Sequence, residues 1–450
     1  MMSTTVYDSI LFKNMFNTAQ MRAVFSDQSL IEKYIETEVA LAKAEAKCGV
    51  IPEEAALQIE QEAKFEKLDL ELMQHQTEIV GYPILPLVEQ LSKICGDAGR
   101  YVHWGATTQD IMDTAVVLQI KQAFDLVEQD ISDLRDILLE LSEKYKNTAM
   151  AGRTHLQHAL PITFGYKCAI WLAMFDRHAQ RLQEMKPRIL VGEFAGAAGT
   201  LASLGDKGLD VQAEMMNILG LGVPQTTWHV ARDGLAEAIN FLGLVTGSLG
   251  KIALDILLMM TNEIGEAFEP FVKGRGASST MPQKRNPISC ELIYACAKGV
   301  RQHAGLMLDA MIQDFERSTG PWQAEWIAIP EAFALTGSAL SQAKFMLSGL
   351  EVFPDRMTKN LHLTNGLIVA EAVMMGLAPY IGRQIAHEVV YDACRLSFKE
   401  NITLHEALMK DAKVTEKLSE EQLQKLTTPE NYIGLAPKMV ERAIEISKNM

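Results

Sequence analysis

Hydroxyl, basic and glycine residues crowd into one segment, residues 274–287, which reads Gly-Arg-Gly-Ala-Ser-Ser-Thr-Met-Pro-Gln-Lys-Arg-Asn-Pro. Glycines on one side and prolines on the other predict a mobile loop with a stiff exit. A serine hydroxyl is a poor base unless cations stabilise its alkoxide and water is excluded. A loop that closes over a substrate could supply both conditions. The segment therefore suggests a serine base, although a flexible surface loop with solvated charges has the same composition. The neighbouring hydroxyl and cationic residues are Ser278, Ser279, Lys273, Arg275, Lys284 and Arg285.

A second candidate block, residues 152–159, reads Gly-Arg-Thr-His-Leu-Gln-His-Ala. Histidine titrates near neutrality, so His155, which follows Thr154 near a helix break, could serve as a general acid. A hydrogen-bonded structural histidine is the alternative. The role of His158 stays open.

The third block, residues 103–110, reads His-Trp-Gly-Ala-Thr-Thr-Gln-Asp. Its hydroxyl and amide side chains, on Thr107, Thr108 and Gln109, stand just ahead of an expected helix. Such groups at a helix N-terminus suit carboxylate binding. Thr107 or Thr108 could equally cap the helix, and both roles can hold together.

The helix expected after this block runs from about Thr108 to Tyr145. Its apolar residues alternate steps of three and four, a heptad-like seam held for four heptads. The seam is formed by Val117, Ile120, Phe124, Val127, Ile131, Leu134, Leu138, Leu141 and Tyr145. A helix on the order of 50 Å long belongs either to a bundle within the chain or to one shared between subunits.

Helix signals dominate the rest of the chain. An earlier helix is expected to start near Ser26 and Asp27 and to stop at Gly49. Another apolar segment runs from about Leu235 to Phe268, and no alternating pattern predicts a strand. We expect an all-α fold: a helical N-terminal domain (1–112), a central long-helix bundle (113–355) and a helical C-terminal domain (356–450).

Composition excludes several classes of protein. The 450 residues carry a net charge of −15, which disfavours a general nucleic-acid or acidic-membrane role. The 6 cysteines are scattered without a CxxC pair, so neither a zinc site nor a disulfide framework is indicated. They are typical of reduced cytosolic thiols, and the start of the chain lacks a secretory signal. The apolar stretch 236–260 contains charged residues, so a buried core helix explains it better than a membrane span.

The loop at 274–287 resembles the signature of the fumarase/aspartase superfamily, approximately G-S-S-x-M-P-x-K-x-N-P. Ala277 alone departs from it, standing for the usual glycine. The resemblance implies that Ser278 removes a proton from the carbon next to a substrate carboxylate. It implies that Lys284 and Asn286 bind substrate carboxylates.

The two other blocks also resemble segments of this superfamily, and the resemblance covers nearly the whole chain. It implies a general-acid role for His155 and adds Thr154 and Arg317 to the substrate-binding candidates. It implies a homotetramer in which each active site is built from three subunits. We expect a cytoplasmic enzyme that needs neither metal nor other cofactor, because fixed cations and amide donors can stabilise the doubly charged aci-carboxylate intermediate.

The overall pattern is most similar to the 3-carboxy-cis,cis-muconate cycloisomerases. Those enzymes usually carry tryptophan at the position of His155, whereas the adenylosuccinate lyases carry histidine there. The lyases also have a His-Asp pair near residues 78–81, which read Glu-Ile-Val-Gly here. Trp104, Trp322 and Trp326 could narrow the pocket and exclude a nucleotide, or simply pack in the core.

Three hypotheses follow. The first is a cycloisomerase acting on a small di- or tricarboxylate. The second is a C–N or C–O lyase that releases fumarate from a succinyl adduct, or a related epimerase. A non-catalytic crystallin-like protein is disfavoured by the intact Ser278, His155 and Lys284.

Overall fold

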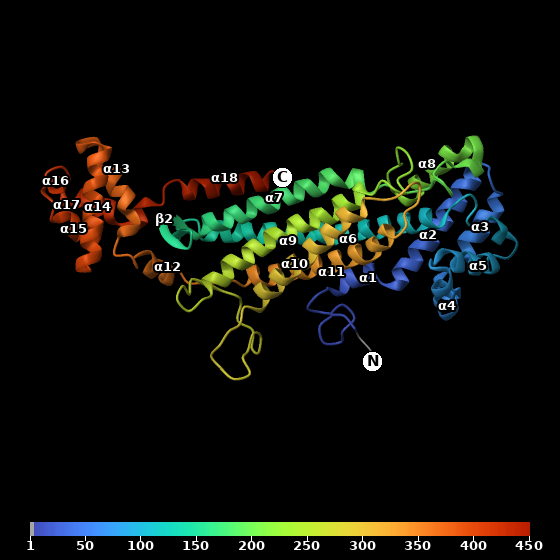
Figure 1. Ribbon diagram of the computed structural model, residues 1–450, viewed down its shortest axis with the longest axis horizontal. Coiled ribbons are helices and arrows are strands. Elements are labelled where there is room, and N and C mark those ends of the chain that lie inside the picture. The colour runs from blue at the N-terminus through green and yellow to red at the C-terminus, as the bar shows by residue number, and fades with distance from the viewer. Residues whose placement is uncertain (1–3) are drawn as a thin grey trace. The chain divides into compact units, whose positions relative to one another are not determined.

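The computed structural model describes residues 4–450, most of them in α-helices (Figure 1). Residues 1–3, part of the chain start on which the absence of a secretory signal was judged, lie outside the described residues. The all-α prediction is confirmed. Contacts divide the chain into two compact units. The first contains residues 1–131, 178–250 and 292–342, and the second contains residues 132–177, 251–291 and 343–450.

The long helix predicted after the third block is confirmed as α6, Thr108–Lys144. Its apolar seam is buried from Val117 to Leu141, and Tyr145 just beyond the helix is half-buried. The helix predicted from Ser26 is α2, Asp27–Lys47, and the Ser26 hydroxyl accepts a hydrogen bond from the Ser29 N–H. Periodicity and capping residues were sufficient to define both elements.

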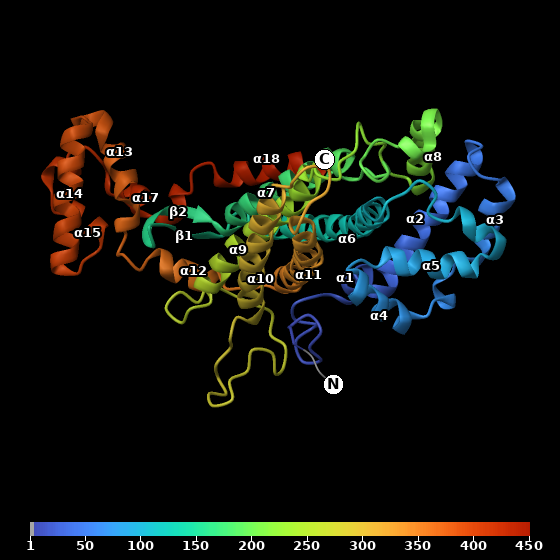
Figure 2. The same cartoon turned by 45° about the vertical axis from the view of Figure 1, so that its right-hand side comes forward.

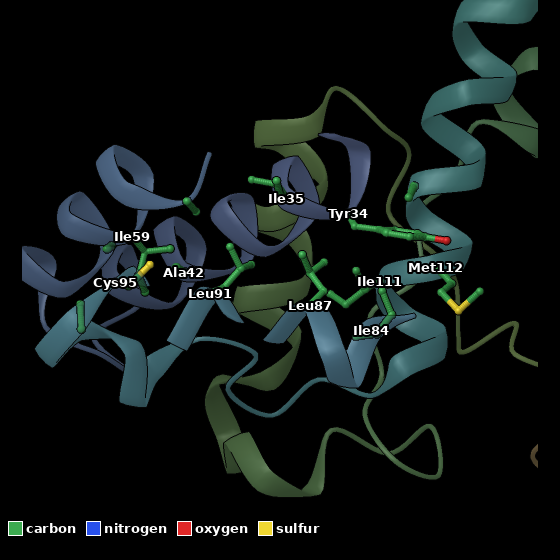
Figure 3. Close-up of a cluster of buried hydrophobic side chains, with 14 of the residues drawn as sticks. Tyr34, Ile35, Ala42, Ile59, Ile84, Leu87, Leu91, Cys95, Ile111 and Met112 are labelled. Atoms are coloured by element: carbon green, nitrogen blue, oxygen red, sulfur yellow. The ribbon is translucent and has the colours of Figure 1, made fainter. Parts of the chain in front are cut away.

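The first unit begins with a set of short helices that pack around α2. They are α1 (Ala19–Val24), α3 (Glu53–Glu62), η1 (Phe65–Lys67), α4 (Leu70–Val80), α5 (Ile84–Ile94) and η2 (Gly96–Tyr101), and they are joined later in the chain by η3 (Ala202–Lys207) and α8 (Gly208–Leu219). Apolar side chains of α2, α3, α5 and the start of α6 form one buried cluster, including Tyr34, Leu87, Leu91 and Ile111 (Figure 3). This packing holds the N-terminal end of α6, and with it the third candidate block, in a fixed environment.

The second unit contains the C-terminal helices and all the strands of the described residues. Its helices are α12 (Pro354–Leu361), η4 (Leu367–Val369), α13 (Ala370–Ile381), α14 (Arg383–Glu400), α15 (Leu404–Met409), α16 (Ala412–Thr415), α17 (Glu420–Thr427), η5 (Pro429–Tyr432) and α18 (Ala436–Lys448). Helices α13 to α17 enclose their own apolar cluster around Leu377, Val390 and Leu408.

Five long helices have residues in both units: α6, α7 (Phe164–Ile189), α9 (Asp233–Met259), α10 (Ile288–Ala310) and α11 (Pro321–Ser348). The predicted division at residues 112 and 355 remains a prediction, because the contacts group these helices differently from their order along the chain.

No alternating pattern in the sequence predicted a strand, yet the structure contains short strands. Two antiparallel pairs are present, β1 (Ala149–Thr154) with β2 (Gln157–Thr163) and β3 (Ala267–Phe268) with β4 (Glu351–Val352). The first pair escaped notice because β1 is rich in small residues, β2 contains Pro161, and the register shifts between Ala151 and Arg153. The second pair is only two residues long, too short for an alternating pattern.

The apolar segment after Leu235 forms α9, which ends at Met259, earlier than the apolar run itself. By length and composition alone this helix could cross a membrane, but half of its most apolar window is buried within the structure. Ile239, Leu242, Val245 and Leu249 are fully buried on one side of it. These contacts support the prediction of a buried core helix.

Candidate active site

The loop that carries Ser278 is closed at its neck by Gly276 and Asn286. The backbone and side-chain nitrogens of Asn286 both donate to the Gly276 carbonyl, at 2.9 and 3.0 Å. Gly276 has φ +67°, and a Cβ there would lie 2.4 Å from the Asn286 carbonyl oxygen. Only glycine fits this position. The side-chain nitrogen of Asn286, a predicted substrate ligand, is therefore occupied in holding the loop.

The Ser278 hydroxyl lies inside this loop and is partly exposed. Its oxygen accepts hydrogen bonds from the N–H groups of Met281, at 3.1 Å, and Thr280, at 3.3 Å. Backbone donors that converge on an oxygen stabilise negative charge on it. The local fold thus provides part of what a serine alkoxide needs, and Ser279 has no comparable donors among the described contacts.

Two of the four nearby cations anchor the loop instead of surrounding the hydroxyl. Arg275 donates to the Ser289 hydroxyl at 2.6 Å, and its guanidinium lies 4.5 Å from the Phe345 ring centre. Arg285 pairs with Glu351 at 3.0 Å. Lys284, the cation of this loop predicted to bind substrate, is exposed, as is Lys273.

His155 lies at the tip of the β1–β2 hairpin. Thr154 pairs with Gln157, leaving His155 and Leu156 as a two-residue turn with φ of +51° and +62°. Such a turn normally carries Asn-Gly, because other residues are strained there by roughly 1–3 kcal/mol each. Both side chains, and that of Thr154, are exposed. The fold therefore presents His155 outward on a defined turn.

A buried ion pair fixes the base of this hairpin. Arg153 makes two hydrogen bonds to Glu266, at 2.9 and 2.7 Å, and Asn360 donates to the same carboxylate at 2.8 Å. Glu266 is fully buried. Burial, followed by the nearby charge of Arg153, lowers the pKa of His158, so this histidine is neutral near pH 7. His158 is partly buried and lies close enough to Arg153 and Glu266 for both charges to act on it.

Thr107 and Thr108 stand at the N-terminus of α6, as predicted. The Thr107 N–H donates to the Asp110 carboxylate at 2.9 Å, which leaves the hydroxyl group outside the capping contact. Gln109, in contrast, is fully buried and donates to Asp113 at 3.0 Å and to the His229 carbonyl at 2.8 Å. Its predicted role as a substrate ligand remains a prediction.

Arg317 reaches the same region of the first unit. The Arg317 side chain donates to the Ala197 carbonyl at 2.9 Å. The N–H groups of Ala195 and Gly196, which precede Ala197, donate to Asp110, each at 3.0 Å. The segment 195–197 therefore links Arg317 to the turn at Thr107.

The predicted residues are divided between the two units. Thr107, Thr108, Gln109 and Arg317 belong to the first unit, whereas the hairpin and the serine loop belong to the second. Figures 1 and 2 show the loop that precedes α10, in yellow, extending away from the chain without reaching the β1–β2 hairpin.

Comparison with known proteins gives the family. Residues 15–301 match the family described as lyase, and residues 366–443 match the adenylosuccinate lyase C-terminus. Trans-aconitate decarboxylase 1 of Mycosarcoma maydis is 47% identical, over 96% of this chain and 88% of the decarboxylase. The 3-carboxy-cis,cis-muconate cycloisomerase of Pseudomonas aeruginosa is 45% identical, over 96% of this chain and 95% of the cycloisomerase. A fumarate lyase from Mesorhizobium sp. BNC1 is 56% identical, with a TM-score of 0.91 over 96% of this chain and 98% of that structure. The chain belongs to the fumarase/aspartase superfamily of lyases.

The tryptophans of this lyase that the sequence placed near the pocket have different environments. Trp322 is buried and donates to Asp113 at 3.0 Å, and its ring meets Trp326 edge-on with centres 5.1 Å apart. Both line a cavity of about 290 Å³ in the first unit, next to Asp113 and Arg232. Trp104 is 43% exposed.

Buried charged groups beneath Thr107 in this lyase were not recognised from the sequence. Arg232 forms ion pairs with Asp113 and Glu325, each at 2.6 Å, and Asp110 bonds to His229 at 2.7 Å. No spacing rule joins Arg232 to Asp113 and Glu325, which lie 119 and 93 positions away along the chain.

Proposed function

We propose that this lyase acts on a small unsaturated tricarboxylate and that Ser278 exchanges a proton with the carbon next to a carboxylate. The best candidate reaction is the intramolecular addition of a substrate carboxylate to a double bond, as in a 3-carboxy-cis,cis-muconate cycloisomerase. A carboxylate oxygen bonds to one alkene carbon and the other carbon takes a proton. The reverse direction removes that proton and breaks the C–O bond.

The convergence of two N–H donors on Ser278 carries this proposal. A base made from serine needs its negative charge stabilised, and this loop provides donors, while no carboxylate of the described residues contacts the hydroxyl. The substrate class follows from the relatives, because 3-carboxymuconate and trans-aconitate are both small unsaturated tricarboxylates. Amide donors and cations are sufficient for the carbanion, so the proposed step uses no cofactor.

The remaining predicted residues have roles in binding. Thr107, Thr108, Gln109 and Arg317 would hold one end of the substrate. The residues of the second unit that would contact its other carboxylates are Thr154, Lys284 and Asn286. Exposed His155 and the serine loop do not meet within one chain, so we propose that a homotetramer shares its active sites between subunits. Cytoplasmic location remains a prediction.

Fumarate release from a succinyl adduct is the second candidate, favoured by His155. A proton donor is most useful when an amine, thiol or alkoxide must leave, whereas an attacking carboxylate is already ionised. The similarity to the fumarate lyase from Mesorhizobium sp. BNC1 also favours this reaction.

A substrate panel separates the two candidates. Purified protein is given 3-carboxy-cis,cis-muconate, trans-aconitate, an N-substituted aspartate and adenylosuccinate at equal concentration, and absorbance is followed in the ultraviolet. We expect turnover of a tricarboxylate. Turnover of the substituted aspartate alone, abolished in His155→Ala, would establish the second candidate. Efficient cleavage of adenylosuccinate would refute a small substrate.

A further inference from the structure

Three ionisable side chains meet in the interior of the first unit, behind the turn at Thr107. Asp110 comes from α6, Glu193 from the segment after α7, and His229 from the segment before α9. Asp110 and Glu193 are fully buried and His229 is 1% exposed. One potential ligand atom from each lies within 4.8 Å of the others. Such a group could hold either a metal ion or a proton.

The hydrogen bonds of Asp110 favour a proton. Its Oδ2 accepts from the N–H groups of Thr107, at 2.9 Å, and Gly196, at 3.0 Å. Its Oδ1 accepts from Ala195 N–H at 3.0 Å and from His229 Nε2 at 2.7 Å. A carboxylate has about four lone-pair sites, and four donors already use them. No lone pair of Asp110 is left for a cation.

Glu193 is only partly satisfied. One carboxyl oxygen, Oε2, accepts from the Trp228 N–H. The other, Oε1, is buried without a hydrogen-bond partner among the described residues. The main chain of Glu193 is nevertheless held firmly, because its N–H and carbonyl both bond to the Thr114 hydroxyl of α6 at 2.8 Å. A buried ionised carboxylate with an unpaired oxygen costs far more free energy than a neutral carboxyl group in the same place.

The charges facing Glu193 come from the two elements packed against it. Asp110 and Asp113 lie on α6, and His229 and Arg232 lie in the segment just before α9. Arg232 is already shared by Asp113 and Glu325, so it offers little compensation. Burial raises the pKa of Glu193 to about 7; the charge of His229 opposes this effect and the two aspartates reinforce it.

We propose that Glu193 is a positioning residue that must carry a proton for residues 193–197 to stay packed against the substrate-binding turn at Thr107. The functional part of this inference rests on the proposed function, in which Thr107 contacts a substrate carboxylate. Ionised Glu193 would place a second negative charge beside Asp110, and its Oε1 has no hydrogen-bond donor among the described residues. The segment would then relieve the repulsion by moving away from α6.

The direction of the pH effect follows from linkage. Glutamate ionises near pH 4.5 in an exposed segment and near pH 7 in this packed one. The proton-dependent stabilisation is therefore fully present below about pH 4.5 and is lost as pH rises to about 7. Between pH 5 and pH 8 the opening equilibrium of the segment should rise by up to roughly seventyfold, if the open state fully solvates the carboxylate.

Amide hydrogen exchange provides a measurement that needs no substrate. The N–H groups of Thr107, Ala195 and Gly196 all donate to Asp110, so their protection reports the packing. After correction for intrinsic rates, wild-type protection should fall by tens of fold between pH 5 and 8, and Glu193→Gln should remove this dependence. Glu184→Gln, an exposed change on α7, should behave as wild type. Equal pH dependence in wild type and Glu193→Gln would overturn the proposal.

Steady-state kinetics test the link to the substrate. In wild type, KM for the tricarboxylate should rise severalfold from pH 6 to pH 8 with a smaller change in kcat, while Glu193→Gln keeps a flat KM. Flat KM in both proteins, despite lost protection in wild type, would overturn the positioning role. If no tricarboxylate is turned over, the proposed function fails and hydrogen exchange still decides the proton-dependent packing. If Glu193→Gln does not fold, a wild type with pH-independent protection refutes the inference by itself.

Discussion

Glu45, on α2, provides a sharp test of how a buried charge limits the stability of this fold. The side chain is fully buried, and neither carboxyl oxygen has a hydrogen-bond partner among the described residues. Burial, with a further contribution from the charge of Glu38, raises the pKa of Glu45 to about 9. The folded protein therefore keeps Glu45 protonated at neutral pH. Glu45→Gln preserves the shape of that neutral form and removes the ionisation.

The stability that Glu45→Gln should gain follows from the pKa of Glu45 in the unfolded and in the folded chain. An unfolded chain ionises Glu45 near pH 4.5 and the folded chain near pH 9, so stability is lost as pH rises through this window. At pH 7, 2.5 units above the unfolded pKa, the loss of stability is about 3.5 kcal/mol at about 1.4 kcal/mol per unit, and by pH 9 it reaches roughly 6 kcal/mol. These are upper limits, because water that enters the site would lower the pKa. Glu45→Gln should recover the difference.

Urea unfolding of wild type and Glu45→Gln at about pH 5, 7 and 8.5 measures the effect. The two proteins should be nearly equally stable at the lowest pH, and the advantage of the variant should widen at each step upward. Glu54→Gln, an exposed change on α3, should follow wild type throughout. If the free-energy difference between wild type and Glu45→Gln is the same at all three pH values, Glu45 does not titrate as its burial implies.

Two further predictions concern catalysis. Ser278→Ala should keep the fold and oligomer but lower turnover at least about a thousandfold, since it removes the oxygen on which the loop donors converge; Ser279→Ala should be milder. More than about a tenth of wild-type activity in Ser278→Ala would assign the base elsewhere. Inactive Ser278→Ala and His155→Ala proteins, dissociated and mixed, should regain partial activity because some shared sites receive both intact residues. An active monomer in analytical ultracentrifugation would rule out shared sites.

The parts of the fold that could be predicted are those with a short-range cause. The apolar seam of α6 repeats every three or four residues, and Ser26 caps α2 by accepting from the N–H of Ser29, three residues further on. The β1–β2 hairpin has no comparable signal. Its turn uses His155 and Leu156 in a backbone region that usually requires glycine or asparagine. Tertiary contacts, above all the pair between Arg153 and Glu266, stabilise it instead.

The same distinction applies to the candidate site. The motif around Ser278 lies within one loop, so its residues could be named together from the sequence. Which members face a ligand depended on the fold: Arg275 is tied to Ser289, and the side-chain nitrogen of Asn286 closes the loop neck. The cluster that includes Glu193 joins segments far apart in the chain, and no local pattern specifies such a meeting.

The exposure of the catalytic candidates is itself an argument about assembly. A serine alkoxide is useful only where water is excluded, yet Ser278 is partly exposed and Lys284 is exposed in the single chain. His155 is presented to solvent on a strained turn that a buried ion pair keeps in place. Maintaining strain on an exposed residue makes sense if something else completes its surroundings. For a member of this superfamily with rigid anchors and open sites, a second copy of the chain is the partner that best accounts for all three residues.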